Sequence, residues 1–211
     1  MLRNFKAFSA FLVSAVLATA SFADITDNSG AGFSIPDNDP AGIFSTINIG
    51  ADETITDVTV TLFGLSHTWV GDVTAEIIHD GATTAVLFER VGDTGGTSGD
   101  SSAFGGGDYT FADGGDDLWA AADAAGFGEP IAPGTYAPSG QFNVPVSLAG
   151  TFAGESTSGS WTLFMNDVAN GDTGSITGWG ISFSSSAAIP EPGSFALLGV
   201  LGLGCVIRRR R

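Results

Sequence analysis

Two histidines and one serine motif are the residues of this chain that could support nucleophilic catalysis. A serine triad needs a histidine between a nucleophile and a carboxylate, and His67 and His79 are the two histidines in the sequence. Gly99-Asp100-Ser101 has the form of a serine nucleophile motif, but it continues into Ser102-Ala103 within a loose, glycine-rich stretch. We therefore expect no serine protease site.

Two Asp-Thr-Gly segments could form another kind of site, because two such turns can share one proton between their carboxylates. They are Asp93-Thr94-Gly95 and Asp172-Thr173-Gly174. That arrangement needs an apolar strand before each aspartate, whereas Arg90-Val91-Gly92 and Ala169-Asn170-Gly171 precede them. Both segments are expected to be ordinary turns, and no catalytic residue is predicted.

Aspartates in turn-rich segments make calcium binding the chemistry that the sequence favours. Calcium takes about six to eight oxygen ligands, and aspartate side chains with turn carbonyls supply them without cysteine or histidine. No EF-hand template is present, and each single aspartate could instead cap a turn or face solvent. The predicted calcium ligands are Asp37, Asp39, Asp72, Asp113, Asp116, Asp117, Asp167 and Asp172.

The acidic residues are concentrated between the two ends of the chain. The formal net charge is -16, and every acidic residue except Glu191 lies between Asp24 and Ala188, where Arg90 is the only lysine or arginine. Such a surface repels nucleic acid and anionic lipid, which require basic side chains to neutralise phosphate. It attracts cations, although acidity also keeps an exported protein soluble. The single cysteine, Cys205, lies near the C-terminus, so the acidic segment has no disulfide.

Residues 1–23 have the pattern of a signal peptide. Basic residues precede an apolar run from Phe8 to Ala18, and Ser21-Phe22-Ala23 fits the small-x-small pattern before a cleavage site. The apolar run is too short to span a hydrocarbon core of about 30 Å. Signal peptidase is thus expected to cut after Ala23 and to leave a mature chain that begins near Asp24.

Residues 189–211 form a second targeting signal. Pro190-Glu191-Pro192 precedes an apolar run from Phe195 to Ile207 and then four arginines, Arg208 to Arg211. A helix ending at Ile207 would just span a thin bilayer, with the arginines on the cytoplasmic side. These residues resemble the PEP-CTERM sorting signal, which an exosortase recognises. The resemblance implies export, anchoring through this tail alone, and then cleavage near Pro190, Glu191 and Pro192 with transfer to the cell surface or extracellular polymer. A permanent C-terminal anchor is the alternative.

The segment between the two signals, residues 24–188, has the marks of one all-β domain. Val58, Val60 and Leu62 alternate with threonines, the period-2 pattern of a strand with one buried face. We interpret four further alternating segments as two hairpins, formed by residues 73–78 with 84–90 and by residues 161–165 with 179–183. Residues 92–107 read as a long exposed loop, and 118–125 as the only short helix. Two packed antiparallel sheets are expected, with a signal helix before them and a transmembrane helix after them.

Two separated blocks of this domain have a distinctive residue order. The first is His67-Thr68-Trp69-Val70-Gly71-Asp72-Val73, and the second, between residues 152 and 181, contains spaced glycines, aspartates and tryptophans. Both resemble the P domain of proprotein convertases, also called the P/Homo B domain, with Val73 in place of the usual leucine. The resemblance runs from about Ile35 to Phe183, although residues 92–149 match poorly. The matching signature residues are His67, Thr68, Gly71, Asp72, Gly159, Trp161, Asp167, Gly174 and Trp179.

The resemblance to P domains implies a jelly-roll sandwich, frequent calcium binding and an association with subtilisin-like proteases, whereas the residues of this sequence predict no catalytic triad. The function expected is that of an exported module with a stabilising or adhesive role, sorted by exosortase to the cell surface or matrix. One alternative is an accessory domain for a separate subtilisin-like serine endopeptidase. Another is a carbohydrate-binding surface module that uses Trp69 for stacking, although Trp69 is expected to pack in the core.

Overall fold

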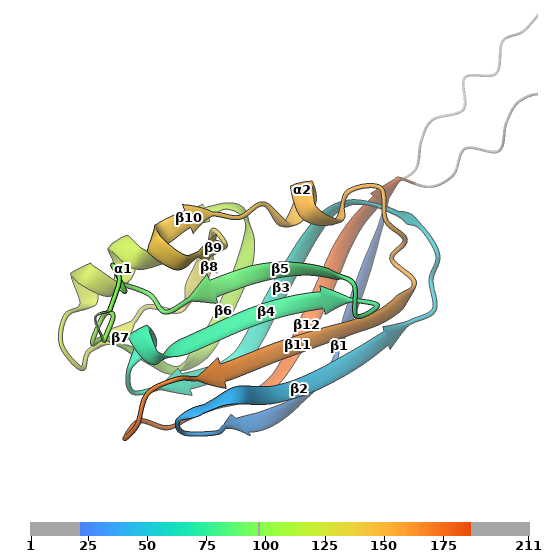
Figure 1. Ribbon diagram of the computed structural model, residues 1–211. Helices are drawn as coiled ribbons and strands as arrows, with labels where there is room; N and C mark the ends of the chain where they lie inside the picture. Colours follow the sequence, from blue (N-terminus) through green and yellow to red (C-terminus); the bar gives the residue numbers. More distant parts are fainter. Residues whose placement is uncertain (1–21, 97, 187–211) are drawn as a thin grey trace, which may run out of the picture. The chain divides into compact units, whose positions relative to one another are not determined.

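The described part of the chain is a two-sheet β-sandwich, as the alternating pattern predicts. The computed structural model describes residues 22–96 and 98–186, which belong to one compact unit. The predicted signal helix, transmembrane helix and sorting tail lie outside these residues. Within the described ranges, no helix is both long and apolar enough to cross a membrane. Figure 1 shows the two sheets stacked, with β5, β4, β11 and β2 in front of β6, β3, β12 and β1.

Sheet A has the strand order β1-β12-β3-β6-β7, and β8 also pairs with β6. Its four long strands are antiparallel, while the short β7 and β8 run parallel to β6. The strands are β1 (Phe22–Ile35), β3 (Thr54–His67), β6 (Ala103–Asp116), β7 (Pro130–Ile131), β8 (Gly134–Tyr136) and β12 (Gly174–Ser186).

Sheet B has the strand order β10-β9-β5-β4-β11-β2. Its pairs are antiparallel except for the single contact between β9 and β5. The strands are β2 (Asp39–Ile49), β4 (Val73–His79), β5 (Thr83–Glu89), β9 (Ser139–Gly140), β10 (Val144–Pro145) and β11 (Gly159–Asp167). The chain crosses between the sheets at each step from β1 to β4, which gives the sandwich its jelly-roll-like character.

The inward-facing residues predicted from the alternation form the core. Val58, Val60 and Leu62 of β3 are fully buried, and their threonine neighbours are partly exposed. A core of this kind removes large apolar side chains from water on both inner faces, which is the main favourable contribution to folding. The other predicted core residues are also buried: Trp161, Leu163 and Met165 of β11, and Trp179, Ile181 and Phe183 of β12.

The predicted hairpin between residues 161–165 and 179–183 is wrong. β11 lies in sheet B between β4 and β2, whereas β12 lies in sheet A between β1 and β3. The two strands bury their apolar faces toward one another across the sandwich instead of pairing edge to edge. Period-2 alternation reports which face of a strand is buried, and two facing strands have the same alternation as two paired ones.

The region from residue 92 to residue 152 contains more structure than its composition indicates. The predicted loop over 92–107 ends earlier, because β6 begins at Ala103. Helix α1 spans Leu118–Ala125, as predicted, but the short helix α2 (Leu148–Phe152) was not expected. Two single-turn 3-10 helices, η1 (Val70–Asp72) and η2 (Gln141–Asn143), complete the elements of the described chain.

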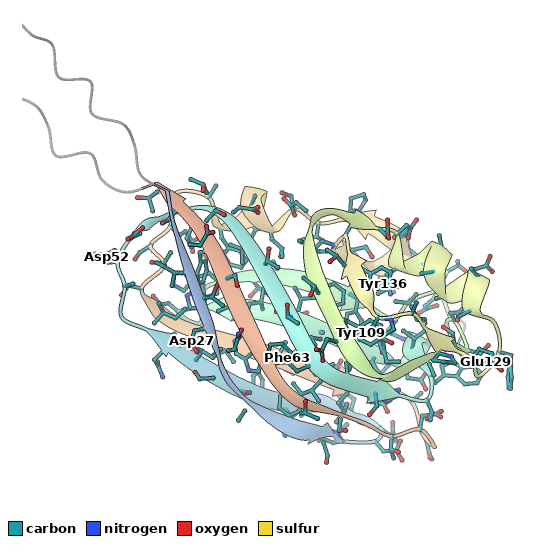
Figure 2. The ribbon with its side chains drawn as sticks, turned by 180° about the vertical axis from the view of Figure 1, so that it is seen from behind. Asp27, Asp52, Phe63, Tyr109, Glu129 and Tyr136 are labelled. Atoms are coloured by element: carbon teal, nitrogen blue, oxygen red, sulfur yellow. The ribbon has the colours of Figure 1, made fainter. Side chains whose placement is uncertain are left out.

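Two buried tyrosines make hydrogen bonds to the segment that follows α1, and both are labelled in Figure 2. The hydroxyl of Tyr109 donates to the carbonyl of Ile131 at 2.7 Å, and that of Tyr136 donates to the carbonyl of Ala132 at 2.6 Å. Strands as short as β7 and β8 form few ladder bonds of their own. The Tyr109 bond therefore helps to hold this segment against β6, and the Tyr136 bond closes the turn between β7 and β8.

Candidate functional site

The first block of signature residues meets part of the second block at one end of the sandwich. β3 ends at His67, η1 follows it, and the connection from β11 to β12 begins at Val168. Gly174 of β12 is paired with His67, and the N–H of Val168 donates to the carbonyl of Asp72 at 3.0 Å. Signature residues that lie far apart in the sequence are therefore spatial neighbours.

His67 and Asp167 form a buried pair between the two sheets. Their side chains are fully buried, and Nε2 of His67 lies 3.1 Å from Oδ2 of Asp167. The other imidazole nitrogen, Nδ1, lies 3.0 Å from the carbonyl oxygen of Trp69, and Oδ1 of Asp167 accepts the N–H of Ala169 at 2.9 Å. Since β3 belongs to sheet A and β11 to sheet B, this pair links the two layers. A buried ionisable group is tolerated only with such partners.

Two signature glycines allow the chain to approach itself closely at the same place. A Cβ on Gly71 would lie 2.4 Å from the carbonyl oxygen of Ser98, and one on Gly174 would lie 2.3 Å from the carbonyl oxygen of Ser66. Any side chain at either position would collide with backbone atoms. Thr68 adds a hydrogen bond to this region, because its hydroxyl donates to Oδ1 of Asp172 at 2.6 Å. Packing thus accounts for the glycine of the first block, and a hydrogen bond accounts for its threonine.

A hollow of about 220 Å³, which we call the acidic hollow, lies beside these residues. Trp69 lies at its rim, half-buried, with its indole N–H donating to the carbonyl of Ser98 at 2.8 Å and its ring edge-on to the exposed Phe127. The expected core position of Trp69 is therefore wrong. The lining residues are Trp69, Asp72, Ser98, Ala169, Asn170 and Asp172.

Sequence reasoning identified only part of this lining. Asp72 and Asp172 were predicted as ligands, whereas Ser98 and Asn170 were not. Asn170 stands in a polar turn between two alternating strands, which is a signal that could have been used. Ser98 lies in a glycine-rich stretch with no such signal.

Asp72 is the acid of the hollow whose pKa is shifted most. Its residue is 3 % exposed, and its Oδ1 is buried without a hydrogen-bond partner. Burial raises the pKa of Asp72 from 3.8 to about 6, and the carboxylates of Asp167 and Asp172 contribute to the increase. Arg90 opposes this effect, and Asp37 adds to it more weakly. The native state therefore disfavours the charged form of this side chain.

The raised pKa of Asp72 predicts a pH-dependent loss of stability. Between about pH 4 and pH 6 the native carboxyl holds a proton that the unfolded chain has lost, so its contribution to stability is complete below pH 4 and is lost as the pH rises through 6. With a chelator present, Asp72→Asn should raise the free energy of unfolding at pH 7 by about 1 to 2 kcal/mol, allowing for solvent screening. Urea denaturation at pH 4.5 and pH 7 measures this, and equal gains at both values would contradict the prediction.

Four of the eight predicted calcium ligands gather around the acidic hollow: Asp37, Asp72, Asp167 and Asp172. Asp37 accepts the N–H of Gly171 at 3.0 Å. Asp39 is opposite Asp167 in the pairing of β2 with β11, and it accepts the N–H of Ala41 at 3.0 Å. Asp37 lies between β1 and β2, and Asp39 is the first residue of β2.

The other three predicted ligands lie on or beside β6. Asp113 accepts hydrogen bonds from the hydroxyl of Ser147 and from the N–H of Leu148, at the start of α2. Asp117 caps α1 by accepting the N–H of Trp119 at 2.9 Å, and Asp116 is the last residue of β6. In residues 22–96 and 98–186, no three His, Cys, Asp or Glu side chains come close enough together to form a metal site on their own.

His79 and Trp161 form a separate cluster at the far end of β4. The two rings stack with 4.1 Å between centroids, and Nδ1 of His79 lies 2.7 Å from Oε2 of Glu155. Gly159 has a φ of 132°, and a Cβ there would lie 2.8 Å from Nε2 of His79. The signature residues Gly159 and Trp161 therefore hold His79 in place. Trp179 is also structural, since its indole N–H donates to the hydroxyl of Ser45 at 3.0 Å in the core.

The aspartates of the two Asp-Thr-Gly segments form side-chain interactions with different residues. Asp93 forms an ion pair with Arg90 at 2.6 Å, and Asp172 accepts the hydroxyl of Thr68. In the part of the chain that the structure covers, neither histidine hydrogen-bonds to a serine or threonine hydroxyl.

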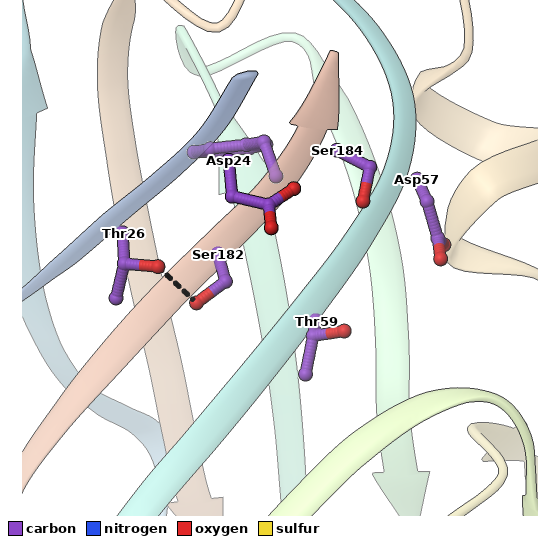
Figure 3. Close-up of a pocket in the computed structure, with 7 residues that line it drawn as sticks. Asp24, Thr26, Asp57, Thr59, Ser182 and Ser184 are labelled. Carbon is purple, nitrogen blue, oxygen red and sulfur yellow. Dashed lines mark hydrogen bonds between the residues drawn. The ribbon is translucent and has the colours of Figure 1, made fainter. Parts of the chain in front are cut away.

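A second polar hollow lies on the outer face of sheet A, as Figure 3 shows. The hydroxyls of Thr26 and Ser182 are hydrogen-bonded across it at 2.9 Å. Phe183 is the only aromatic residue of its lining and is 1 % exposed, so the hollow offers no ring for sugar stacking. We interpret this hollow as solvated sheet surface. The remaining residues that line it are Asp24, Asp57, Thr59 and Ser184.

The residues predicted to be processed lie at one end of the described region and beyond the other end. Ala23 is paired with Ser185, so cleavage after Ala23 would remove the first two residues of β1 and leave Asp24 opposite Ser184. Pro190, Glu191 and Pro192 lie outside the described residues.

Residues 188–211 match the family model of the PEP-CTERM protein-sorting motif. The motif indicates exosortase-dependent export and sorting to the cell surface, as the tail residues predicted. No curated protein matches the chain.

The solved structures that are similar in part include the following three. The serine protease of Aeromonas sobria in complex with its chaperone shares 19% identity over 82% of this chain, with a TM-score of 0.46. The same protease alone shares 18% sequence identity over 80% of this chain, also with a TM-score of 0.46. This chain spans 28% of the length of either protease chain. A structure of infectious bursal disease virus, Gt strain, shares 14% sequence identity with this chain, with a TM-score of 0.22. The match covers 86% of this chain and 47% of the viral chain. Similarity at this level establishes no shared activity.

Proposed function

We propose that this chain is an exported, non-catalytic module of the P/Homo B type with a stabilising or adhesive role at the cell surface or in the extracellular matrix. The observation that carries the proposal is the sorting motif at residues 188–211, which follows directly after the β-sandwich. Processing by signal peptidase and exosortase then leaves residues 24–188 as the mature, functional domain. Before cleavage, the chain contacts the membrane only through its tail.

The P/Homo B assignment is supported by the way in which the signature residues meet. His67 of the first block pairs with Asp167 of the second, and Gly174 packs against Ser66 and His67. Residues from both blocks therefore serve one structural purpose, the closing of the two sheets at one end. This is what a domain signature without catalytic residues would require.

The proposed lack of catalysis is supported by the environments of the histidines. Both are buried, and each is held by a carboxylate on one ring nitrogen and a backbone carbonyl near the other. A general base must reach the proton it removes, and these rings are occupied by structural partners.

Sorting can be tested by expressing the full chain in a host with its exosortase. The intact chain is expected to lose its tail and reach the surface, whereas replacement of Pro190, Glu191 and Pro192 by alanine should leave the tail attached and the protein in the membrane fraction. Mass spectrometry of the products shows where the chain has been cleaved at its N-terminus and at its C-terminus. The matched control, Asp123→Ala on the exposed side of α1, should be processed like the wild type.

The surface-sorted product also tests the absence of catalysis. It is expected to leave casein and peptides with basic cleavage sites intact. Cleavage that survives removal of co-purifying proteins would contradict the proposal, while cleavage that is lost with a co-purifying subtilisin-like protease would favour the accessory role. Identical processing of the intact and triple-alanine chains would contradict the sorting mechanism.

A further inference from the structure

The outer face of sheet B carries an exposed aromatic ring on its edge strand. Phe44 of β2 is 59 % exposed, and its ring centroid lies 4.9 Å from that of Phe164, the residue opposite it on β11. Gly42 makes room for the second ring, since a Cβ there would lie 2.5 Å from Cε2 of Phe164. In Figure 1 this face is toward the viewer, and no helix is drawn across β2 or β11. Apolar surface that is left open in this way is typical of an interaction site.

A pair of threonines lies beside the two rings. Thr46 and Thr162 are opposite one another in the pairing of β2 with β11, two positions from the phenylalanines, so all four side chains share one face of the sheet. The two hydroxyls are hydrogen-bonded at 2.8 Å. That bond uses one of their two protons, so the pair keeps one O–H donor and several acceptor lone pairs for a ligand. We call Phe44, Thr46, Thr162 and Phe164 together the aromatic platform.

The aromatic platform is an uncharged area on a strongly acidic domain. Carboxylates lie at its borders, where Asp80 accepts the hydroxyl of Ser160 at 3.1 Å and Glu76 of β4 is opposite Phe164. An anionic ligand would be repelled by the acids of the domain, and a second copy would bring two acidic domains together. The charge distribution therefore favours an uncharged ligand. The outward-facing residues of β2 from residue 44 onward and of β11 are all uncharged: Phe44, Thr46, Asn48, Ser160, Thr162, Phe164 and Asn166.

We propose that the aromatic platform binds an uncharged polysaccharide, with a sugar ring stacked on Phe44 and sugar hydroxyls bonded to Thr46 and Thr162. A pyranose ring has a face of C–H groups and a rim of hydroxyls, which matches an aromatic ring that lies beside hydroxyl groups. Neighbouring strands are about 4.8 Å apart, so a chain that lies across the sheet meets β2 and then β11. The inference rests on the proposed adhesive role and names a ligand class for it.

Affinity electrophoresis of the full chain in detergent tests this site. Hydroxyethyl cellulose, galactomannan and dextran in native gels serve as uncharged probes, and alginate serves as an anionic one. At least one uncharged probe is expected to retard the wild type, whereas alginate should not. Phe44→Ala should weaken binding by about tenfold through the loss of stacking, and Thr162→Val by about threefold through the loss of a hydroxyl. Phe44→Trp should bind at least as tightly as the wild type, because it offers a larger ring.

Phe127→Ala is the matched control, because Phe127 is also an exposed aromatic residue, at 80 %, but lies beside Trp69. It should bind like the wild type, and Phe44→Ala should melt like the wild type because its side chain is exposed. The inference would be overturned by a wild type that none of the three uncharged probes retards, by equal losses in Phe44→Ala and Phe127→Ala, or by equally tight binding of alginate.

Two further results distinguish this inference from its alternatives. A dimer seen by analytical ultracentrifugation that Phe44→Ala dissociates, without polysaccharide binding, would assign the platform to a second copy and overturn the inference. A chain that is processed and sorted as proposed but binds no polysaccharide would contradict only the ligand, whereas a chain that binds polysaccharide through Phe44 but keeps its tail would support the platform and contradict only the sorting mechanism.

Discussion

An Asp167→Ala variant is expected to lose about 3 to 5 kcal/mol of its free energy of unfolding. The change leaves the fully buried imidazole of His67 without its carboxylate partner, and it also removes the acceptor for the N–H of Ala169. Domains of this kind have about 5 to 15 kcal/mol in total, so the loss is a large fraction of the whole. The effect would extend to both sheets, because the pair joins β3 to β11.

Urea denaturation followed by circular dichroism measures the loss in Asp167→Ala. Asp123→Ala serves as the control and should change stability by less than about 0.5 kcal/mol, since Asp123 is exposed on α1. His67→Ala and the double variant complete a cycle that isolates the coupling between the two side chains. A loss below about 1 kcal/mol in Asp167→Ala would show that the pair does not hold the sheets together.

Trp161→Ala is expected to cost about 3 to 5 kcal/mol as well, but through packing rather than electrostatics. The Trp161 side chain is fully buried, stacks on His79 and contacts the rings of Phe152 and Phe183 at centroid distances of 5.0 and 4.9 Å. Its indole N–H donates to the carbonyl of Thr157 at 3.0 Å, so truncation also leaves a buried carbonyl without its donor. The surrounding side chains are expected to relax only partly into the cavity.

Equilibrium unfolding monitored by fluorescence and circular dichroism together checks the effect of Trp161→Ala. Trp161→Phe keeps most of the ring contacts and should lose clearly less free energy of unfolding than Trp161→Ala. Trp119→Ala, at a half-buried position on α1, provides a tryptophan control with a smaller expected loss. Equal losses in Trp161→Ala and Trp119→Ala would contradict the central position of Trp161 in the core.

The sequence predicts the strands of this fold better than their pairing. Alternation places Val58, Val60 and Leu62 on a buried face, and the same logic places Trp161 and Trp179 in the core. Pairing depends on contacts between segments far apart in the chain, which a local pattern does not record. The wrongly predicted hairpin of β11 with β12 is a direct result.

The candidate site was predictable only in part for the same reason. Asp117 precedes an apolar helical segment, the usual place of an N-cap, so its role could have been predicted locally. Asp113 binds Ser147 and the first residues of α2, which lie 34 to 36 positions later, and no local signal reveals such partners. Distinguishing Asp72 from these capping aspartates required its burial and its orphaned oxygen, which are properties of the folded chain.

The position of β12 also determines how the domain would respond to mechanical tension. This strand begins at Gly174, just after Asp172 of the acidic hollow, and one residue separates its last residue from the matched sorting motif. It is paired along most of its length with β1 on one side and β3 on the other. Because ladder bonds in antiparallel sheets lie perpendicular to the strands, a pull along β12 loads many of them together in shear instead of peeling them apart singly. Force applied between the C-terminal tail and the acidic hollow would therefore pass through a strand that is hydrogen-bonded to a neighbour on each side.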